Sequence, residues 1–163
     1  IRYVLENNIP QWSNSQVFTS VKTDLRENTP FKLTSDAVLV SESAMGVVEC
    51  KLIRNSSFTH GMLEQVLLYC EVIRKMGTQE LKKALTEAKL RNPVGNPRFD
   101  WAKLPEIKAN CFPIIVIDRW GGKFQNTAQI TLSLINAALP KIGRNSIQLY
   151  VRSGDTFEMI NDS

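Results

Sequence analysis

Two acidic residues and a lysine lie where a plain hydrophobic core would not place them. Asp36 opens one apolar run, Asp36–Val40, and Glu49 and Lys51 belong to a second run, Gly46–Leu52. Each run has the length and composition of a β-strand, and the polar segment between them is of hairpin length. Side chains alternate along a strand, so Glu49 and Lys51 point to the same face. If the two strands pair, Asp36 and Glu49 meet near one end of the hairpin.

The chemistry of this group follows from its charges. Two carboxylates held close together repel each other, so they share a proton or bind a cation. Carboxylate oxygens favour a hard cation such as Mg²⁺, which keeps several waters and often binds substrate phosphate as well. Lys51 beside them would orient a water or stabilise a developing negative charge. The pattern therefore indicates metal-assisted chemistry at a phosphate.

A helix is predicted over Thr59–Met76, because its apolar residues recur with helical spacing and form a wide stripe. Gln65 and Tyr69 are four positions apart and share one face of that helix. One interpretation makes them boundary residues whose polar ends reach water. The other places them in a cleft beside Lys51. We favour the second, because they follow the Glu-x-Lys strand.

Together, Asp36, the run Glu49-Cys50-Lys51 and the pair Gln65 and Tyr69 resemble the PD-(D/E)XK nuclease superfamily, in the branches that carry a QxxxY motif. The amino-acid sequence of about Leu33–Val72 is also similar to that of uncharacterised bacterial members of that superfamily. The resemblance implies an α/β fold with a restriction-endonuclease-like αβββαβ core, in which helices flank a mixed central sheet. The order of predicted elements agrees with such a mixed sheet.

The same resemblance implies a set of site residues. Those expected in catalysis are Asp36, Glu49, Lys51, Gln65 and Tyr69. Those expected to bind Mg²⁺ or Mn²⁺ are Asp36, Glu49, the backbone carbonyl of Cys50 and Glu6, the last from the first helix of the family. For Glu6, a solvated surface position is the open alternative.

The function expected from this resemblance is a divalent-metal-dependent nuclease, an endonuclease acting on DNA rather than RNA. The alternative is a catalytically silent nuclease-like domain that binds nucleic acid or another protein. A third possibility is a plain α/β domain in which Glu-x-Lys occurs by chance. Nucleic acid is the expected partner, and a homodimer or a larger parent protein is also considered.

Composition narrows the class of protein. With 163 residues, 43% hydrophobic and 22% charged, the chain is expected to form one domain over residues 1–163, complete or as part of a longer protein. The net charge of +4 is compatible with nucleic acid without indicating it. One histidine and three cysteines, without a Cys-x-x-Cys pattern, argue against zinc and favour reduced core thiols. No signal peptide or membrane span is visible, so a cytoplasmic location is expected.

The remaining elements are predicted from local patterns. Helices are expected over Thr78–Leu90 and Thr127–Leu139, and strands over Gln16–Val21, Phe112–Asp118 and Ser146–Val151. Ile130, Leu134 and Ala138 are expected on the apolar side of the second helix. Asp118 is expected to serve a turn or a cap.

Three further segments carry weaker patterns. Asn92–Asn110 is rich in proline and polar residues and predicts a long loop, pinned to the body by Phe99 and Trp101; stacking of these rings on bases is the alternative. Ile1–Trp12 predicts the tail of a helix that ends before Pro10. The tail from Arg152 predicts an edge segment or a frayed end.

Overall fold

The fold is built on one mixed β-sheet with helices packed against it. The computed structural model describes residues 9–23, 33–53, 60–88, 90–91 and 99–160. Its elements in chain order are η1 (Pro10–Trp12), β1 (Gln16–Thr23), β2 (Leu33–Val40), β3 (Met45–Lys51), α2 (His60–Lys75), α3 (Thr78–Thr86), β4 (Leu90–Arg91), η2 (Trp101–Lys103), α4 (Leu104–Ala109), β5 (Cys111–Ile117), α5 (Gly122–Ala138), η3 (Leu139–Ile142), β6 (Gln148–Ser153) and β7 (Thr156–Ile160). The expected α/β class with a mixed sheet is confirmed.

The strands follow the order β4-β1-β2-β3-β5-β6-β7 across the sheet. β1, β2 and β3 form an antiparallel meander, while β5 pairs parallel to β3 and β6 parallel to β5. β7 returns antiparallel on β6 and forms one edge. The neighbouring parallel strands β3 and β5 are almost continuously buried, as expected for strands covered on both faces, whereas β6 is buried only in its middle.

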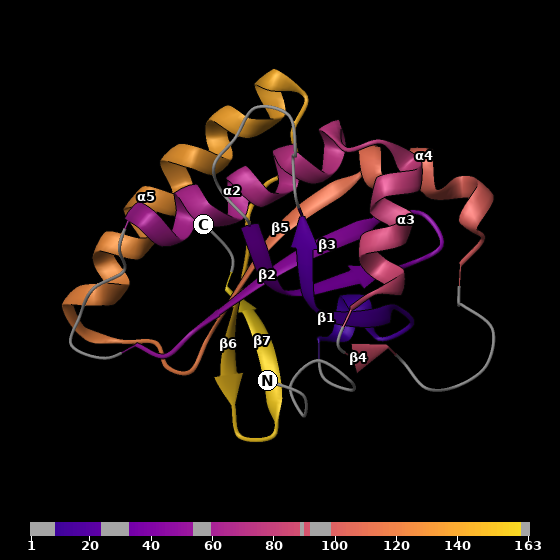
Figure 1. Ribbon diagram of the computed structural model, residues 1–163. Coiled ribbons are helices and arrows are strands. Elements are labelled where there is room, and N and C mark those ends of the chain that lie inside the picture. The colour runs from indigo at the N-terminus through magenta and orange to yellow at the C-terminus, as the bar shows by residue number, and fades with distance from the viewer. Residues whose placement is uncertain (1–8, 24–32, 54–59, 89, 92–98, 161–163) are drawn as a thin grey trace.

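The helices α2, α3 and α5 cover one face of the sheet (Figure 1). α2 packs its apolar stripe between two clusters, one shared with α3 and α4 and the other with α5. On the opposite face, Ile9 and Trp12 pack over the inner strands. Gly46 allows this approach, because a Cβ there would lie 2.6 Å from Cδ1 of Ile114 and 3.3 Å from the Trp12 ring. In the described residues, no helix has the length and apolarity needed to cross a bilayer.

The strands and the first helix that frame the candidate site agree with the predictions to within a few residues. β2 begins three residues before Asp36, so this residue lies inside the strand rather than at its start. β3 and α2 are each shifted by about one residue from the predicted ranges. Expected strands near the N-terminus and in the centre of the sheet are likewise present as β1 and β5.

The prediction that Asn92–Asn110 is one long loop was wrong for its second half. Asp100 caps η2, since its Oδ1 accepts a hydrogen bond from the Ala102 N–H at 2.9 Å, and α4 follows directly. Leu104 and Ile107, three residues apart, are both fully buried and hold this short helix to α2. Residues 92–98 lie outside the described part of the chain.

The aromatic residues of this segment pin it to the body, as predicted. Phe99 is buried, and its ring packs edge to face against Phe18 at 6.3 Å and Trp101 at 4.8 Å. Lys82 of α3 lies over the Trp101 ring at 5.3 Å. The rings are therefore engaged within the protein, which argues against base stacking here.

The helix predicted over Thr78–Leu90 ends earlier, at Thr86. Leu90 belongs instead to β4, where it pairs with Thr19 of β1. The sequence Ala-Lys-Leu favours a helix, but pairing with the free side of β1 satisfies backbone groups that the helix would leave to water. Tertiary structure thus overrides local propensity at this point.

α5 begins five residues before the predicted start and turns a different side to the sheet. Ile130 and Leu134, expected to be buried, are 64% and 69% exposed. Leu132, 3% exposed, faces the core instead. Buried Asn136 fixes this rotation, because its side chain bonds both the N–H and the carbonyl of Ile147, at 2.8 and 3.1 Å.

The C-terminal part of the chain can be compared with the prediction, whereas most of the N-terminal segment cannot. The strand predicted over Ser146–Val151 is β6, which begins at Gln148, two residues later than predicted. After it, the tail forms the edge strand β7 rather than a frayed end. The helix tail expected to end before Pro10 falls largely in residues 1–8, which lie outside the described part of the chain; η1 begins at Pro10. All three cysteines are free thiols.

Candidate active site

The hairpin of β2 and β3 determines where the acidic residues lie. Ala37 pairs with Val48 and Val38 with Val47, so Asp36 and Glu49 are the next positions of the same register. Because residues alternate along each strand, Asp36, Glu49 and Lys51 share the face that also carries Val38 and Val47. Those two valines pack in the cluster that contains α2. The structure therefore brings Asp36, Glu49 and Lys51 together on the helix-covered face.

Glu49 is the most perturbed acid of the site. It is only 2% exposed, and its Oε1 has no hydrogen-bond partner in the described part of the chain. Burial, and then the negative charge of Asp36, raise the pKa of Glu49 from 4.5 to about 7. Lys51 opposes this rise, with its Nζ 4.0 Å from Oε2 of Glu49. Glu49 is thus a buried acceptor whose charge is only partly compensated.

Lys51 differs from Glu49 in its access to solvent. Its side chain is 41% exposed, so the ammonium lies at the surface while it remains within ion-pair distance of the buried carboxylate. A cation in this position can reach a ligand in solution without leaving Glu49. The lysine and the glutamate therefore provide both an exposed positive charge and a buried negative one.

Asp36 is half-buried and holds the backbone of the neighbouring strand. Its Oδ2 accepts a hydrogen bond from the Cys50 N–H at 2.8 Å. Burial, and then the charge of Asp36, raise the pKa of the Cys50 thiol to about 12, and the side chain packs with the cluster on the opposite face of the sheet. Cys50 is also the register partner of Val116 in the parallel ladder. That its carbonyl binds a metal stays a prediction.

Gln65 and Tyr69 form a hydrogen-bonded chain from α2 to β2. The Gln65 Nε2 donates to the Tyr69 hydroxyl at 2.8 Å, and this hydroxyl donates to the Thr34 carbonyl at 3.0 Å. Thr34 lies two residues before Asp36 on the same side of the strand. Burial raises the pKa of Tyr69, the hydrogen bond from Gln65 lowers it, and the charges of Glu49 and Asp36 add to the rise.

Sequence reasoning did not identify the strand-end contact made by Asp118. Its Oδ1 accepts a hydrogen bond from the Ile53 N–H at 2.6 Å, which ties the end of β3 to the end of β5. This bond joins segments that are 65 residues apart in the chain, so it is neither the turn nor the helix cap expected at Asp118. The contact fixes the segment directly after Lys51, a role that no spacing between Asp118 and Ile53 could have revealed.

The donors present suit a hard cation, although they are few. Asp36 and Glu49 supply carboxylate oxygens, and the unpartnered Oε1 of Glu49 is a buried acceptor that a cation would satisfy. Over the described ranges, no group of three or more histidine, cysteine, aspartate or glutamate side chains is placed so that it could hold a metal ion. Glu6, the further ligand expected from the resemblance, lies outside the described residues. Water or substrate oxygens would therefore complete the coordination.

A scan against protein-family models and searches of curated proteins and solved structures gave no match. The interpretation of this site therefore depends on the chain's own residues and their geometry.

Proposed function

We propose that this protein is a divalent-metal-dependent nuclease of the PD-(D/E)XK type, which hydrolyses phosphodiester bonds, in DNA rather than RNA. The observation that carries the proposal is the convergence of Asp36, Glu49 and Lys51 on one face, with a buried carboxylate oxygen that lacks a partner in the described part of the chain. The hydrogen bonds that link Gln65 to Tyr69, and Tyr69 to the strand of Asp36, support the proposal.

The order of elements supports the restriction-endonuclease-like αβββαβ core as part of this proposal. The meander β1–β2–β3 is followed by α2, and the chain then returns in β5, parallel to β3. The helix that would precede the meander falls in residues 1–8, outside the described part. The long apolar strand β5 next to β3 supports the strand that carries Glu49 and Lys51.

In this proposal Asp36 and Glu49 would hold Mg²⁺ or Mn²⁺. When bound, the ion would supply polarisation of the phosphate and a lowered pKa for water. Lys51 would orient the attacking water or balance the negative charge that develops on phosphorus-bound oxygens. The Tyr69 hydroxyl would hold the start of β2, and with it the carboxylate of Asp36, in place.

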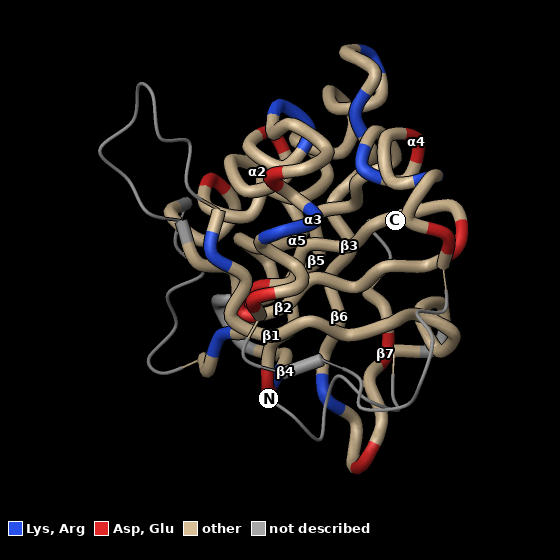
Figure 2. The backbone as a smooth tube through the Cα atoms, turned by 45° about the vertical axis from the view of Figure 1, so that its right-hand side comes forward, with Lys and Arg blue, Asp and Glu red and all other residues tan. Residues whose placement is uncertain are grey.

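The charge distribution bears on how nucleic acid would be bound. Basic and acidic positions are interspersed over the described chain rather than gathered on separate sides (Figure 2). A net charge of +4 without a large basic surface over these residues favours contact with a few phosphates close to the site. We therefore expect binding that weakens with salt, but with a small number of released counterions.

The test is cleavage of supercoiled plasmid, linear duplex, single-stranded DNA and RNA, with Mg²⁺, Mn²⁺ or EDTA. We expect metal-dependent cutting by the wild type, and a loss of at least about 100-fold in Glu49→Gln and Lys51→Met, as for removal of a group that stabilises transition-state charge. Glu42→Gln and Lys22→Met change exposed residues of the same types and serve as matched controls. Cutting that survives in Glu49→Gln would refute the assignment.

The alternative, a silent nuclease-like domain that binds nucleic acid or protein, is favoured by one observation. In the part of the chain that the structure describes, the acidic ligands number only two, Asp36 and Glu49. Binding of DNA without any cutting in either metal, by protein whose fold is verified, would favour this function. Isothermal titration of Mn²⁺ separates the two functions further, because only the nuclease needs a site that Glu49→Gln abolishes.

A further inference from the structure

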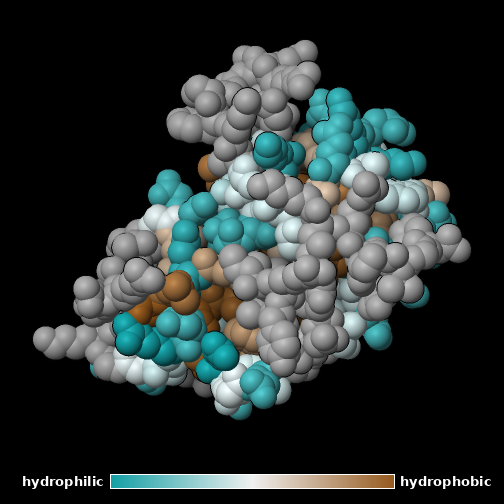
Figure 3. All heavy atoms as spheres, turned by 60° about the horizontal axis from the view of Figure 1, so that its bottom comes forward, coloured by the Kyte–Doolittle hydropathy of each residue, from teal (hydrophilic) through white to brown (hydrophobic). Residues whose placement is uncertain are grey.

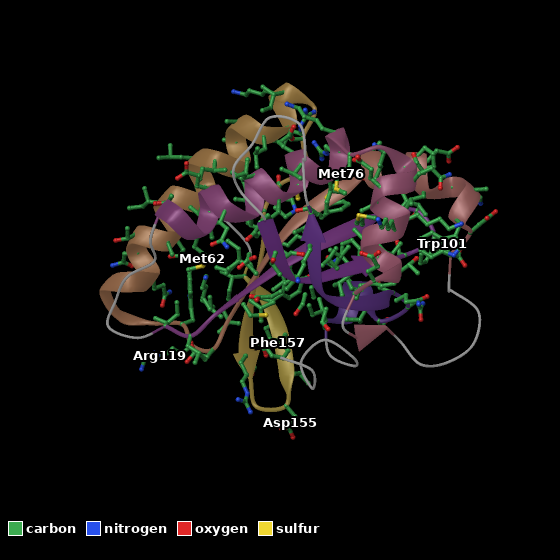
Figure 4. All side chains as sticks on the ribbon, in the orientation of Figure 1. Met62, Met76, Trp101, Arg119, Asp155 and Phe157 are labelled. Carbon is green, nitrogen blue, oxygen red and sulfur yellow. The ribbon has the colours of Figure 1, made fainter. Side chains whose placement is uncertain are left out.

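A hollow lies at the carboxyl ends of the parallel strands, mostly on the face of the sheet opposite to α2. It has a volume of about 330 Å³ and is lined by Cys50, Lys51, Leu52, Val116, Ile117, Asp118, Arg152 and Phe157. Cys50, Val116 and Phe157 belong to the core cluster of that opposite face. Figure 4 shows Phe157 on the β6–β7 hairpin and Asp155 at its tip. The side that carries this hairpin exposes an apolar area with hydrophilic borders (Figure 3).

The hollow is joined to the candidate active site through β3. Lys51 lines the hollow and also lies with its Nζ 4.0 Å from Oε2 of Glu49. Cys50 forms part of the wall, while its backbone N–H bonds Asp36. A ligand in the hollow is therefore separated from the two carboxylates only by the strand that carries Glu49.

The lining has the chemistry of a site for a flat apolar group that is attached to anions. The inner wall is mainly apolar, from Cys50, Val116 and Phe157, and two cations, Lys51 and Arg152, border it. Asp118 also lines the hollow, but one of its oxygens is held by the Ile53 N–H. A nucleobase has this character, because its ring faces are apolar and its strand carries a phosphate on each side. The volume is at the lower end for ligand pockets, which suits one base rather than a stacked pair.

We propose that this hollow binds one base of the substrate strand, unstacked from its neighbours, while the adjoining phosphate lies at Lys51. This occupant is chosen because its chemistry matches that of the hollow. The apolar wall suits the ring of a base, and the two bordering cations suit the phosphates that flank the base in a strand. The substrate class rests on the proposed nuclease function. The base would anchor the strand from the face of the sheet opposite to the carboxylates, and fix which phosphodiester bond meets Asp36 and Glu49.

The test measures binding in EDTA, so that no cleavage is needed. Short single strands of DNA and RNA are compared with strands of the same length in which every base is replaced by an abasic analogue. We expect the base-bearing strands to bind about tenfold more tightly, as for one base stacked on an apolar wall. Amide resonances of Cys50, Val116 and Phe157 should shift with the base-bearing strands and stay unchanged with the abasic ones.

Leu52→Glu places a negative charge at the border of the hollow, at a residue that is already 66% exposed. We expect this variant to lose the advantage of the base-bearing strand over the abasic one, and to bind both strands more weakly, because the added charge also repels their phosphates. Leu134→Glu is the matched control, an exposed leucine on α5 outside the hollow, and should bind as the wild type does. Folding of both variants is checked by their amide spectra.

The outcomes separate this inference from the proposed function. Base-dependent binding with shifts at the hollow, but no cutting in any metal, would support the base site and refute the nuclease. Cutting that depends on Glu49, with equal affinity for base-bearing and abasic strands, would overturn the base site and leave the nuclease standing. Shifts confined to other parts of the sheet or to α3 would also overturn it.

Discussion

Replacing Glu49 by glutamine should stabilise the metal-free protein above neutral pH. The pKa of Glu49 is raised from 4.5 to about 7 by burial and by Asp36. One pH unit corresponds to about 1.4 kcal/mol, so ionising Glu49 costs the native state about 3 kcal/mol more than it costs the unfolded chain. Between pH 4.5 and about pH 7, Glu49 is still protonated in the native state but already ionised in the unfolded chain. The free energy of unfolding therefore falls as the pH rises through this range. A glutamine side chain does not titrate, so Glu49→Gln escapes this loss.

The assay is urea unfolding of wild type and Glu49→Gln in EDTA, from about pH 4 to pH 8. We expect the difference in unfolding free energy between variant and wild type to grow by about 3 kcal/mol across this range, in favour of the variant. Glu42→Gln, at an exposed glutamate, is the matched control. Added Mg²⁺ should stabilise the wild type more than Glu49→Gln. A difference between the Glu49 variant and the wild type that is independent of pH would refute the electrostatic account of this site.

Four substitutions test the packing described above. Leu132→Ala should cost about 2–5 kcal/mol in urea unfolding and Leu134→Ala less than about 0.5, because only Leu132 is buried; equal costs would contradict the rotation of α5. Tyr69→Phe should cost about 1–3 kcal/mol and lower any nuclease activity, since it removes two hydrogen bonds; an unchanged unfolding midpoint would argue against that chain of bonds. Gly46→Ala should cost roughly 1–3 kcal/mol, because the added Cβ would lie 2.6 Å from Ile114, and a stabilised variant would show that this contact relaxes freely.

Much of the fold near the candidate site could be predicted because its local patterns and its tertiary packing agree. The apolar runs of β2, β3 and β5 have the length and composition of strands, and α2 carries a stripe with clear helical spacing. Where the local pattern and the tertiary packing disagree, the prediction from sequence was wrong. Ile130 and Leu134 are as apolar as Leu132, and only the buried bonds of Asn136 decide which side of α5 faces the sheet.

The site itself was predictable in part, for a related reason. Strand alternation and hairpin register are enough to place Asp36 beside Glu49, and helical spacing is enough to place Gln65 beside Tyr69. The bond from Asp118 to Ile53 and the hollow on the opposite face depend on strands that are distant in the sequence. Composition and periodicity carry no information on such parallel neighbours, so these features appear only with the sheet.

The same difference between local and distant pairing has a consequence for how the protein folds. The acidic pair is joined by a hairpin with the short turn 41–44, whereas Met45 meets Cys111 only after a long stretch of chain has closed into a loop. Closure entropy grows with the logarithm of loop length, so the parallel ladder costs about 2 kcal/mol more to begin than the hairpin does. Asp36 and Glu49 thus come together early, before the hollow exists. A cation that binds both carboxylates would accelerate refolding and not merely slow unfolding.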